Sequence, residues 1–227
     1  MRFERTQTWG FEHAIRGARN PMNSWDKSDS GYTYYPGDKQ YDYDDFKIGP
    51  NDMDLLQRLI KAGPEHRKFM RQIMVSVDIT APLYFYKEFD TYKVGTTANS
   101  TSTMHKLATT PITIDCFEIF DYEEITFGIG EIQSPNMIID YCEKLRQKYL
   151  ETKDKKYWKE LIRWLPESWL QTRTVTMNYE NLLAMCSKGQ RRFHKLTEWS
   201  DSFITWARLL PYAQELIFID ELEDKAE

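Results

Sequence analysis

Residues 72–80 restrict the fold most, because β-branched residues occupy every second position there. One face of this segment carries Ile73, Val75, Val77 and Ile79. Strict alternation over this length is typical of a strand that buries one side. Ala81-Pro82 then ends the strand, and Pro82 suits the first position of a helix over about 83–90.

Most of the remaining chain shows apolar residues at helical spacing, with two further extended segments. Helices are predicted over 8–19, 52–63, 134–149, around 158–162, and over 178–186 and 196–210. Asp52 and Asn178 are interpreted as helix caps. Extended segments are predicted over 112–120, part of which tertiary context can make helical, and over 170–177. The fold class is therefore predicted as mixed α/β (α+β), with a central sheet flanked by helices.

Length and composition predict one folded domain over residues 1–227, with two small domains as the alternative. Of these 227 residues, 41% are hydrophobic and 15% aromatic, which is enough for a sizeable core. Residues 21–50 show no sustained period, so a long, ordered N-terminal loop is predicted, and long loops in compact domains are often functional. The acidic tail, residues 220–227, is predicted to be frayed and solvated.

Net charge limits the kinds of partner that this chain is expected to bind, and cysteine content indicates its redox compartment. Lys plus Arg total 30 against 35 Asp plus Glu, and this net charge of −5 does not indicate a broad basic face for nucleic acid. A few arginines still suit a small anion. The three cysteines are widely spaced without a CxxC pattern, which argues against disulfides and structural zinc. With no signal-peptide pattern and no membrane-spanning run, a soluble, cytoplasmic protein without a membrane partner is predicted.

Common catalytic motifs are absent, including GxGxxG, the P-loop, HExxH and GxSxG. The four histidines, His13, His66, His105 and His194, lack metal-ligand spacing. A surface or hydrogen-bonded structural role is the favoured interpretation of each. No metal site is predicted, and no catalytic residue is identified.

A tract of short polar side chains follows the predicted strand and aromatic helix. It contains Thr96, Thr97, Asn99, Ser100, Thr101, Ser102 and Thr103. In a packed core each of these groups needs a hydrogen-bond partner. The tract is therefore either a solvated loop or a ligand cradle, and composition alone favours the loop.

Three polar segments follow one another in a fixed order. They are Thr97-Ala-Asn99-Ser-Thr-Ser102; then Arg163-Trp-Leu165-Pro166 with Asn178 and Leu182; then Arg191 with Glu198. This order resembles the flavin-dependent thymidylate synthases (ThyX), whose signature is Arg-His-Arg followed by Ser-x-Asn-x-x-Ser-x-Arg. Gly63-Pro-Glu-His66 is similar to the family's Gly-His turn, so the resemblance covers about residues 52–210.

Only half of the signature is present. In this register Tyr92, Lys93 and Val94 stand where Arg-His-Arg is expected, Ser100 replaces an acidic residue, and Met104 replaces the last Arg. Losing that Arg removes a bidentate grip on phosphate, which is worth about 1.5–3 kcal/mol. Lys93 supplies charge without the fork geometry. The chain is thus identified as a divergent ThyX-like protein.

The resemblance implies a ThyX-like fold in a homotetramer that binds FAD and a pyrimidine nucleotide. The activity implied is reductive methylation of dUMP to dTMP with NADPH and methylenetetrahydrofolate as co-substrates. Residues implied to contact the nucleotide are Ser100, Ser102, Arg163 and Arg191. Residues implied to contact the flavin or the loop around it are His66, Tyr92, Lys93, Thr97, Asn99 and Asn178.

Each of these residues also has a structural interpretation. Arg163 and Arg191 suit a helix surface, Asn178 suits a cap, and Ser102 suits a loop. The aromatic run Tyr84, Phe85, Tyr86 and Phe89 offers a stacking surface for flavin, although a core position is favoured. Three hypotheses follow: a dUMP-methylating flavoenzyme, a flavoenzyme for another pyrimidine nucleotide, and a non-catalytic nucleotide-binding or structural homologue.

Overall fold

The computed structural model describes residues 1–33, 46–118 and 134–224, in two compact units. Unit 1 comprises Met1–Glu4, Asp78–Thr91 and Ala98–Thr174. Unit 2 comprises Arg5–Val77, Tyr92–Thr97 and Val175–Glu227. The single domain over residues 1–227 therefore stays a prediction.

A four-stranded sheet has the strand order β1-β4-β6-β5. Its strands are β1 (Arg2–Trp9), β4 (Met74–Pro82), β6 (Leu170–Asn178) and β5 (Thr97–Ser100). β4 and β6 confirm the strands predicted over 72–80 and 170–177. In β4 the predicted alternation is present, because Val75, Val77 and Ile79 are at most 1% exposed.

Hydrogen bonds between side chains fix the register of β4 against β6. The pairs are Ser76 with Thr176 (3.2 Å), Asp78 with Thr174 (2.5 Å) and Thr80 with Thr172 (2.7 Å). Residue numbers fall along one strand as they rise along the other, which is the antiparallel pattern. One face of this strand pair therefore carries paired hydroxyl and carboxylate groups, and the other face includes the buried side chains of Val75, Val77, Ile79 and Val175.

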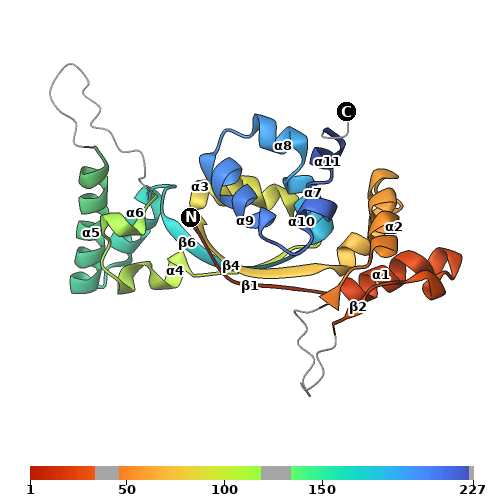
Figure 1. The fold of residues 1–227 in the computed structure, drawn as a ribbon. Coiled ribbons are helices and arrows are strands. Elements are labelled where there is room, and N and C mark those ends of the chain that lie inside the picture. The colour runs from red at the N-terminus through yellow and green to blue at the C-terminus, as the bar shows by residue number, and fades with distance from the viewer. Residues whose placement is uncertain (34–45, 119–133, 225–227) are drawn as a thin grey trace. The chain divides into compact units, whose positions relative to one another are not determined.

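The helices of unit 1 include α5 and α6, which lie side by side (Figure 1). They are α3 (Leu83–Phe89), α4 (Thr103–Lys106), α5 (Ser134–Thr152) and α6 (Lys155–Trp164), with 3₁₀ turns at Leu107–Thr109 and Ile114–Cys116. Between α5, α6 and the two turns lies an apolar core, made of Leu107, Ile112, Phe117, Ile139, Cys142, Leu145 and Leu161.

Most of the described part of the segment predicted as extended over 112–120 is not a strand. Ile114–Cys116 forms a 3₁₀ turn, in which the amide of Phe117 donates to the carbonyl of Ile114 (3.1 Å). The turn directs Ile114 outward, where it is 49% exposed, so the apparent alternation is not one of burial. Among the described residues of this segment, only Phe117 forms a β-bridge, and its partner is Trp169. Residues 119–120 lie outside the described part of the chain.

Glu143 joins α5 to the segment before it and supports a prediction of acid sensitivity. Its carboxylate accepts from Arg146 (2.6 and 2.7 Å) and from the amide of Ile112 (2.8 Å). The Arg146 hydrogen bonds, opposed by burial, lower the pKa of Glu143 to about 2. The stabilisation is therefore fully present above the ordinary pKa of 4.5 and is lost as the pH falls towards 2.

At pH 7 the Glu143→Gln variant should have a free energy of unfolding about 1–2 kcal/mol below that of the natural chain, and this difference should shrink as the pH falls towards 2. Urea unfolding across this pH range measures the effect. Glu151→Gln on the same helix is the matched control, because its ion pair with Lys148 is exposed. An equal loss at pH 7 and pH 2.5 would contradict the assignment.

Unit 2 contains α1 (Phe11–Arg19) and α2 (Pro50–Lys61), which lie side by side (Figure 1). Further along are α7 (Tyr179–Met185), α8 (Lys188–Phe193), a π-helical turn at Glu198–Phe203, α9 (Ile204–Arg208), α10 (Ala213–Leu216) and α11 (Asp220–Asp224). Shorter 3₁₀ turns lie at Asn20–Met22, Trp25–Lys27 and Arg67–Gln72. The core of unit 2 includes the fully buried side chains of Trp199, Phe203, Tyr179 and Phe218.

The segment predicted as a long ordered loop over 21–50 contains short helical turns and strands among its described residues. Besides the two 3₁₀ turns, β2 (Gly31–Tyr32) and β3 (Phe46–Lys47) pair in an antiparallel manner, and residues 34–45 lie outside the described residues. The prediction that Asp52 caps a helix is wrong. The α2 helix already begins at Pro50, and Asp52 is buried against Arg19 (2.5 Å).

The start of the acidic tail is also ordered, contrary to prediction. Asp220 begins α11 and accepts a hydrogen bond from the amide of Lys188 (2.8 Å), which ties it to the start of α8. Residues 225–227 lie outside the described residues. Among the described helices, none is both long and apolar enough to cross a membrane.

Candidate functional site

The start of the predicted signature segment packs on a buried aromatic residue of unit 2. The ring of Tyr92 lies 5.6 Å from that of Trp199, which is fully buried and donates to the carbonyl of Met185 (3.2 Å). The His194 imidazole stacks flat on Trp199, with ring centroids 4.5 Å apart. Tyr92 is therefore partly committed to this packing and is half-buried.

A tight turn follows Tyr92. The Lys93 carbonyl accepts from the amide and the hydroxyl of Thr96 (3.1 and 3.0 Å). Gly95 has φ +81°, which disfavours other residues, and a Cβ there would lie 2.9 Å from Nδ2 of Asn178. The turn thus leaves Lys93 and Val94 exposed and brings the backbone against Asn178.

Two asparagines of unit 2 hold this turn and begin α7. Asn178 and Asn181 form a reciprocal capping box, in which each side chain accepts from the other's amide (3.0 and 3.1 Å). This confirms the cap predicted at Asn178. The Asn181 side chain also donates to the carbonyl of Val94 (2.6 Å). Sequence reasoning did not single out Asn181, although its place three residues after a cap is the usual signal.

The hydroxyl-rich tract is neither a plain loop nor a closed cradle. Thr97–Ser100 forms the edge strand β5, whose four residues are exposed. In unit 1, the amide of Thr101 donates to the carbonyl of Thr172 (2.9 Å). The side chain of Ser102 then caps α4 by accepting from the amide of His105 (3.1 Å). Asn99 and Ser100 therefore present their polar groups to solvent from a fixed backbone.

The two arginines predicted to contact nucleotide both have acidic partners. On α6 of unit 1, Arg163 is 60% exposed and pairs with Glu160 (3.1 Å). In unit 2, Arg191 is only 15% exposed and pairs with Asp220 (2.9 Å) and Glu221 (3.3 Å). It also donates to the Cys186 carbonyl. Arg191 is thus held and neutralised within the chain, whereas Arg163 is the more accessible cation.

The remaining candidates divide between surface and core. His66 is exposed, just before the 3₁₀ turn at Arg67–Gln72. Phe85, Tyr86 and Phe89 are at most 4% exposed, so the favoured core interpretation of the aromatic run is correct for them. Burial raises the pKa of Tyr86 far above its usual value, and the Arg173 guanidinium lies 3.7 Å over its ring.

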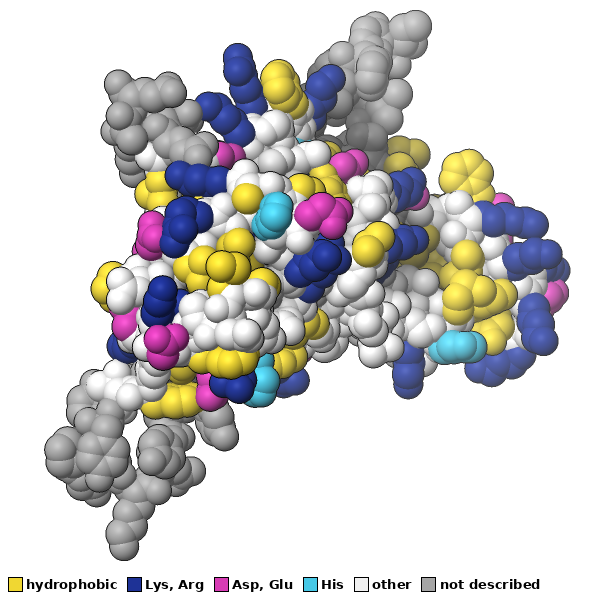
Figure 2. Space-filling view, turned by 90° about the vertical axis from the view of Figure 1, so that its right-hand side faces the viewer, with side chains coloured by type: hydrophobic (Ala, Val, Ile, Leu, Met, Phe, Trp, Pro, Cys, Tyr) yellow, Lys and Arg dark blue, Asp and Glu magenta, His cyan; other side chains and the backbone are white. Residues whose placement is uncertain are grey.

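No continuous basic face is visible on the side of the molecule shown in Figure 2. Lys and Arg side chains there are interleaved with acidic and hydrophobic ones. Over the described ranges, no cluster of His, Cys, Asp or Glu has the geometry to hold a metal ion.

Comparison with solved structures identifies the fold. The chain superposes on the flavin-dependent thymidylate synthase ThyX from Helicobacter pylori, complexed with FAD and dUMP, with a TM-score of 0.66 and 17% sequence identity over 97% of this chain and 99% of that one. The chain has the ThyX fold. The recognition made from the signature segments is thereby confirmed at the level of fold.

A second neighbour is the UMP/dUMP methylase PolB from Streptomyces cacaoi, solved with 5-Br dUMP. Its TM-score is 0.60 and its identity 14%, over 96% of this chain and 94% of that one. No protein-family model and no curated protein sequence matches the chain. The likeness to ThyX and PolB therefore rests on three-dimensional structure, as expected for a divergent ThyX-like chain.

Proposed function

We propose that this chain is a flavin-dependent enzyme that methylates a pyrimidine deoxynucleotide, with dUMP as the first candidate. The observation that carries the proposal is the fold match over nearly the whole of both chains to a structure complexed with FAD and dUMP. The exposed polar edge at Thr97–Ser102 supports it, because the signature resemblance falls on that edge. Three further parts of the proposal rest on the resemblance alone. They are a homotetrameric assembly, a cytoplasmic location, and the use of NADPH and methylenetetrahydrofolate as co-substrates.

The residues around β5 suit a flavin with a weaker anionic grip than the family signature gives. Lys93 is an exposed cation, and Thr97 and Asn99 are exposed hydrogen-bonding groups. Bound FAD supplies the electrons of the reductive step. The chain contributes binding and orientation of the flavin. Tyr92 contributes the accessible part of its ring, Asn178 positions the turn at Gly95, and His66 contributes an exposed imidazole.

For the nucleotide, Ser100 and Ser102 are proposed to hydrogen-bond it, and Arg163 and Arg191 to balance its phosphate. Met104 stands where the family's Arg binds, and in this chain its side chain is 48% exposed while its carbonyl accepts from Trp158 (3.2 Å). The phosphate therefore loses a bidentate partner, so we expect nucleotide affinity about ten- to a hundredfold below that of a chain with the full signature.

The visible spectrum of the purified protein with added FAD tests the proposal. We expect flavin absorption that shifts when dUMP is added. A protein that takes up no FAD refutes both enzyme hypotheses, and calorimetry with dUMP then decides whether the chain is a non-catalytic nucleotide binder. A spectral response to another pyrimidine nucleotide in place of dUMP favours the second candidate, which the likeness to a UMP/dUMP methylase supports.

Ser102 gives the sharpest variant, because its cap can be kept while its charge is changed. Asp caps a helix as well as Ser does, so Ser102→Asp should fold normally, but its carboxylate repels the nucleotide phosphate. We expect this variant to bind FAD with the natural affinity and to lose the dUMP response. Ser102→Thr is the matched control and should keep both. A normal dUMP response in Ser102→Asp would show that the loop alignment is wrong.

A further inference from the structure

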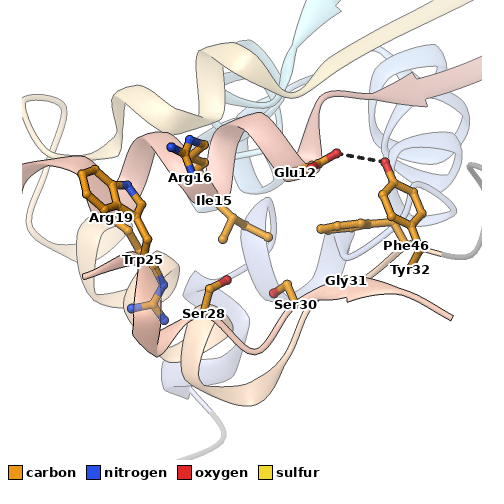
Figure 3. A pocket seen from close by; sticks show the side chains of 10 residues that line it. All are labelled: Glu12, Ile15, Arg16, Arg19, Trp25, Ser28, Ser30, Gly31, Tyr32 and Phe46. Carbon is orange, nitrogen blue, oxygen red and sulfur yellow. Dashed lines mark hydrogen bonds between the residues drawn. The ribbon is translucent and has the colours of Figure 1, made fainter. Parts of the chain in front are cut away.

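Unit 2 contains a cavity of about 200 Å³ that none of the candidate site residues lines. It lies between α1 and the segment that runs from Trp25 to Tyr32 (Figure 3). Its lining residues are Glu12, Ile15, Arg16, Arg19, Trp25, Ser28, Ser30, Gly31, Tyr32 and Phe46.

The two ends of the cavity are aromatic. Trp25 stands at one end, with its indole nitrogen donating to Asn20 (2.8 Å), and is 42% exposed. Tyr32 and Phe46 stand at the other end, edge to face with centroids 5.1 Å apart (Figure 3). Ile15, only 4% exposed, adds an apolar surface between them. Such walls favour a flat apolar body.

Two opposite charges stand at the cavity without neutralising each other. Glu12 and Arg16 are four residues apart on α1, a spacing that usually forms an ion pair. Here Glu12 instead accepts from the Tyr32 hydroxyl (3.1 Å), and the Arg16 guanidinium lies 5.4 Å from the centre of the Trp25 ring. Within the described part of the chain, Arg16 forms no ion pair. A ligand therefore meets a cation near Trp25 and a hydrogen-bond acceptor near Tyr32.

The wall opposite α1 is fixed by a buried polar network. The carboxylate of Asp52 is 1% exposed and accepts from Arg19 (2.5 Å), from the hydroxyls of Ser28 (2.7 Å) and Ser30 (2.6 Å), and from the amides of Asp29 and Ser30 (both 3.1 Å). Burying so many polar groups gains little stability but fixes geometry. The cavity is thus held open in one shape, which lowers the entropic cost of binding.

We propose that this cavity binds a small planar aromatic molecule with an anionic group at one end and an N–H or O–H donor at the other. The anion pairs with Arg16, the ring lies between Trp25 and the Tyr32–Phe46 pair, and the donor reaches Glu12. The volume suits a single ring with short substituents, since pockets for drug-sized ligands begin at about 300 Å³. This inference is independent of the proposed flavin and nucleotide chemistry.

Ligand-detected NMR titration of the full chain with 4-aminobenzoate tests the proposal. We expect a Kd at or below about 5 mM, the range open to a ligand of this size. Aniline lacks the anion and cyclohexanecarboxylate lacks the flat ring, so each should bind at least about tenfold more weakly.

Arg16→Gln removes the cation, and we expect it to weaken binding of 4-aminobenzoate about ten- to a hundredfold. Arg58→Gln, at an exposed position of α2, is the matched control and should bind as the natural chain does. Trp25→Ala gives an independent loss of the ring contact. Absence of binding at 5 mM overturns the proposal, as does equal binding by aniline or by Arg16→Gln with an unchanged circular dichroism spectrum.

Discussion

Replacing Asp52 with alanine is expected to lower the free energy of unfolding by about 3–5 kcal/mol, because it leaves a buried guanidinium without its counter-charge. Arg19 and Asp52 are 5% and 1% exposed. Burial raises the pKa of Asp52, but the hydrogen bonds from Ser30, Ser28 and Arg19 together hold it below its usual value. This contribution is therefore present above the ordinary pKa and is lost as the pH falls below it.

Asp54→Ala supplies the comparison on the same helix, since Asp54 is 67% exposed and pairs with the equally exposed Arg58. Its loss should change stability by less than about 0.5 kcal/mol. Urea unfolding of both variants at pH 7 measures the contrast. The pair Arg19→Ala and Asp52→Ala, combined in a double-mutant cycle, should show a coupling above about 1 kcal/mol. Equal losses for Asp52 and Asp54 would mean that the network is solvated.

Trp199→Ala is expected to cost a similar amount, about 3–5 kcal/mol, because it empties the centre of unit 2. The Trp199 indole is fully buried, with Phe203 at 5.1 Å and His194 at 4.5 Å between ring centroids. The variant also removes the surface on which Tyr92 packs. We therefore expect FAD affinity to fall along with stability, since the turn after Tyr92 loses its support.

Trp164→Ala is the reference for this variant, because Trp164 is 57% exposed. It should cost less than about 1 kcal/mol. Thermal unfolding followed by near-ultraviolet circular dichroism separates the two, since only the buried indole gives a strong signal in a fixed environment. If Trp199→Ala lost stability but kept full FAD affinity, the link between this core and the proposed flavin loop would be rejected.

Strands whose pattern reflects burial were predictable, and those without such a pattern were not. β4 carries buried β-branched residues on one face, and β6 alternates threonines with Gln171, Arg173, Val175 and Met177, so a period of two is visible in both sequences. β1 was missed because most of its residues, in Arg2–Trp9, are exposed and charged or polar. In the segment at 112–120 the pattern is present without the strand. Isoleucines stand at alternate positions there, but a 3₁₀ turn forms after Pro111.

For the candidate site, the sequence indicated residue types but not their partners. The capping role of Asn178 is local and was predictable. The contacts of Asp52 with Arg19 and of Tyr92 with Trp199 join residues 33 and more positions apart. Nothing in a local pattern encodes such contacts. The cavity beside α1 likewise arises only when the turn at Trp25–Lys27 folds back on that helix.

Any phosphate that binds Arg191 must compete with the ion pairs that Arg191 already forms with Asp220 and Glu221. These carboxylates are tethered to the same chain, so they compete at an effective concentration in the millimolar range or above, whatever the solution contains. A phosphate must displace an anion already in place, and only the difference between the two interactions favours binding. Because Asp220 and Glu221 together already bring two negative charges to Arg191, we expect even a doubly charged phosphate to gain little there.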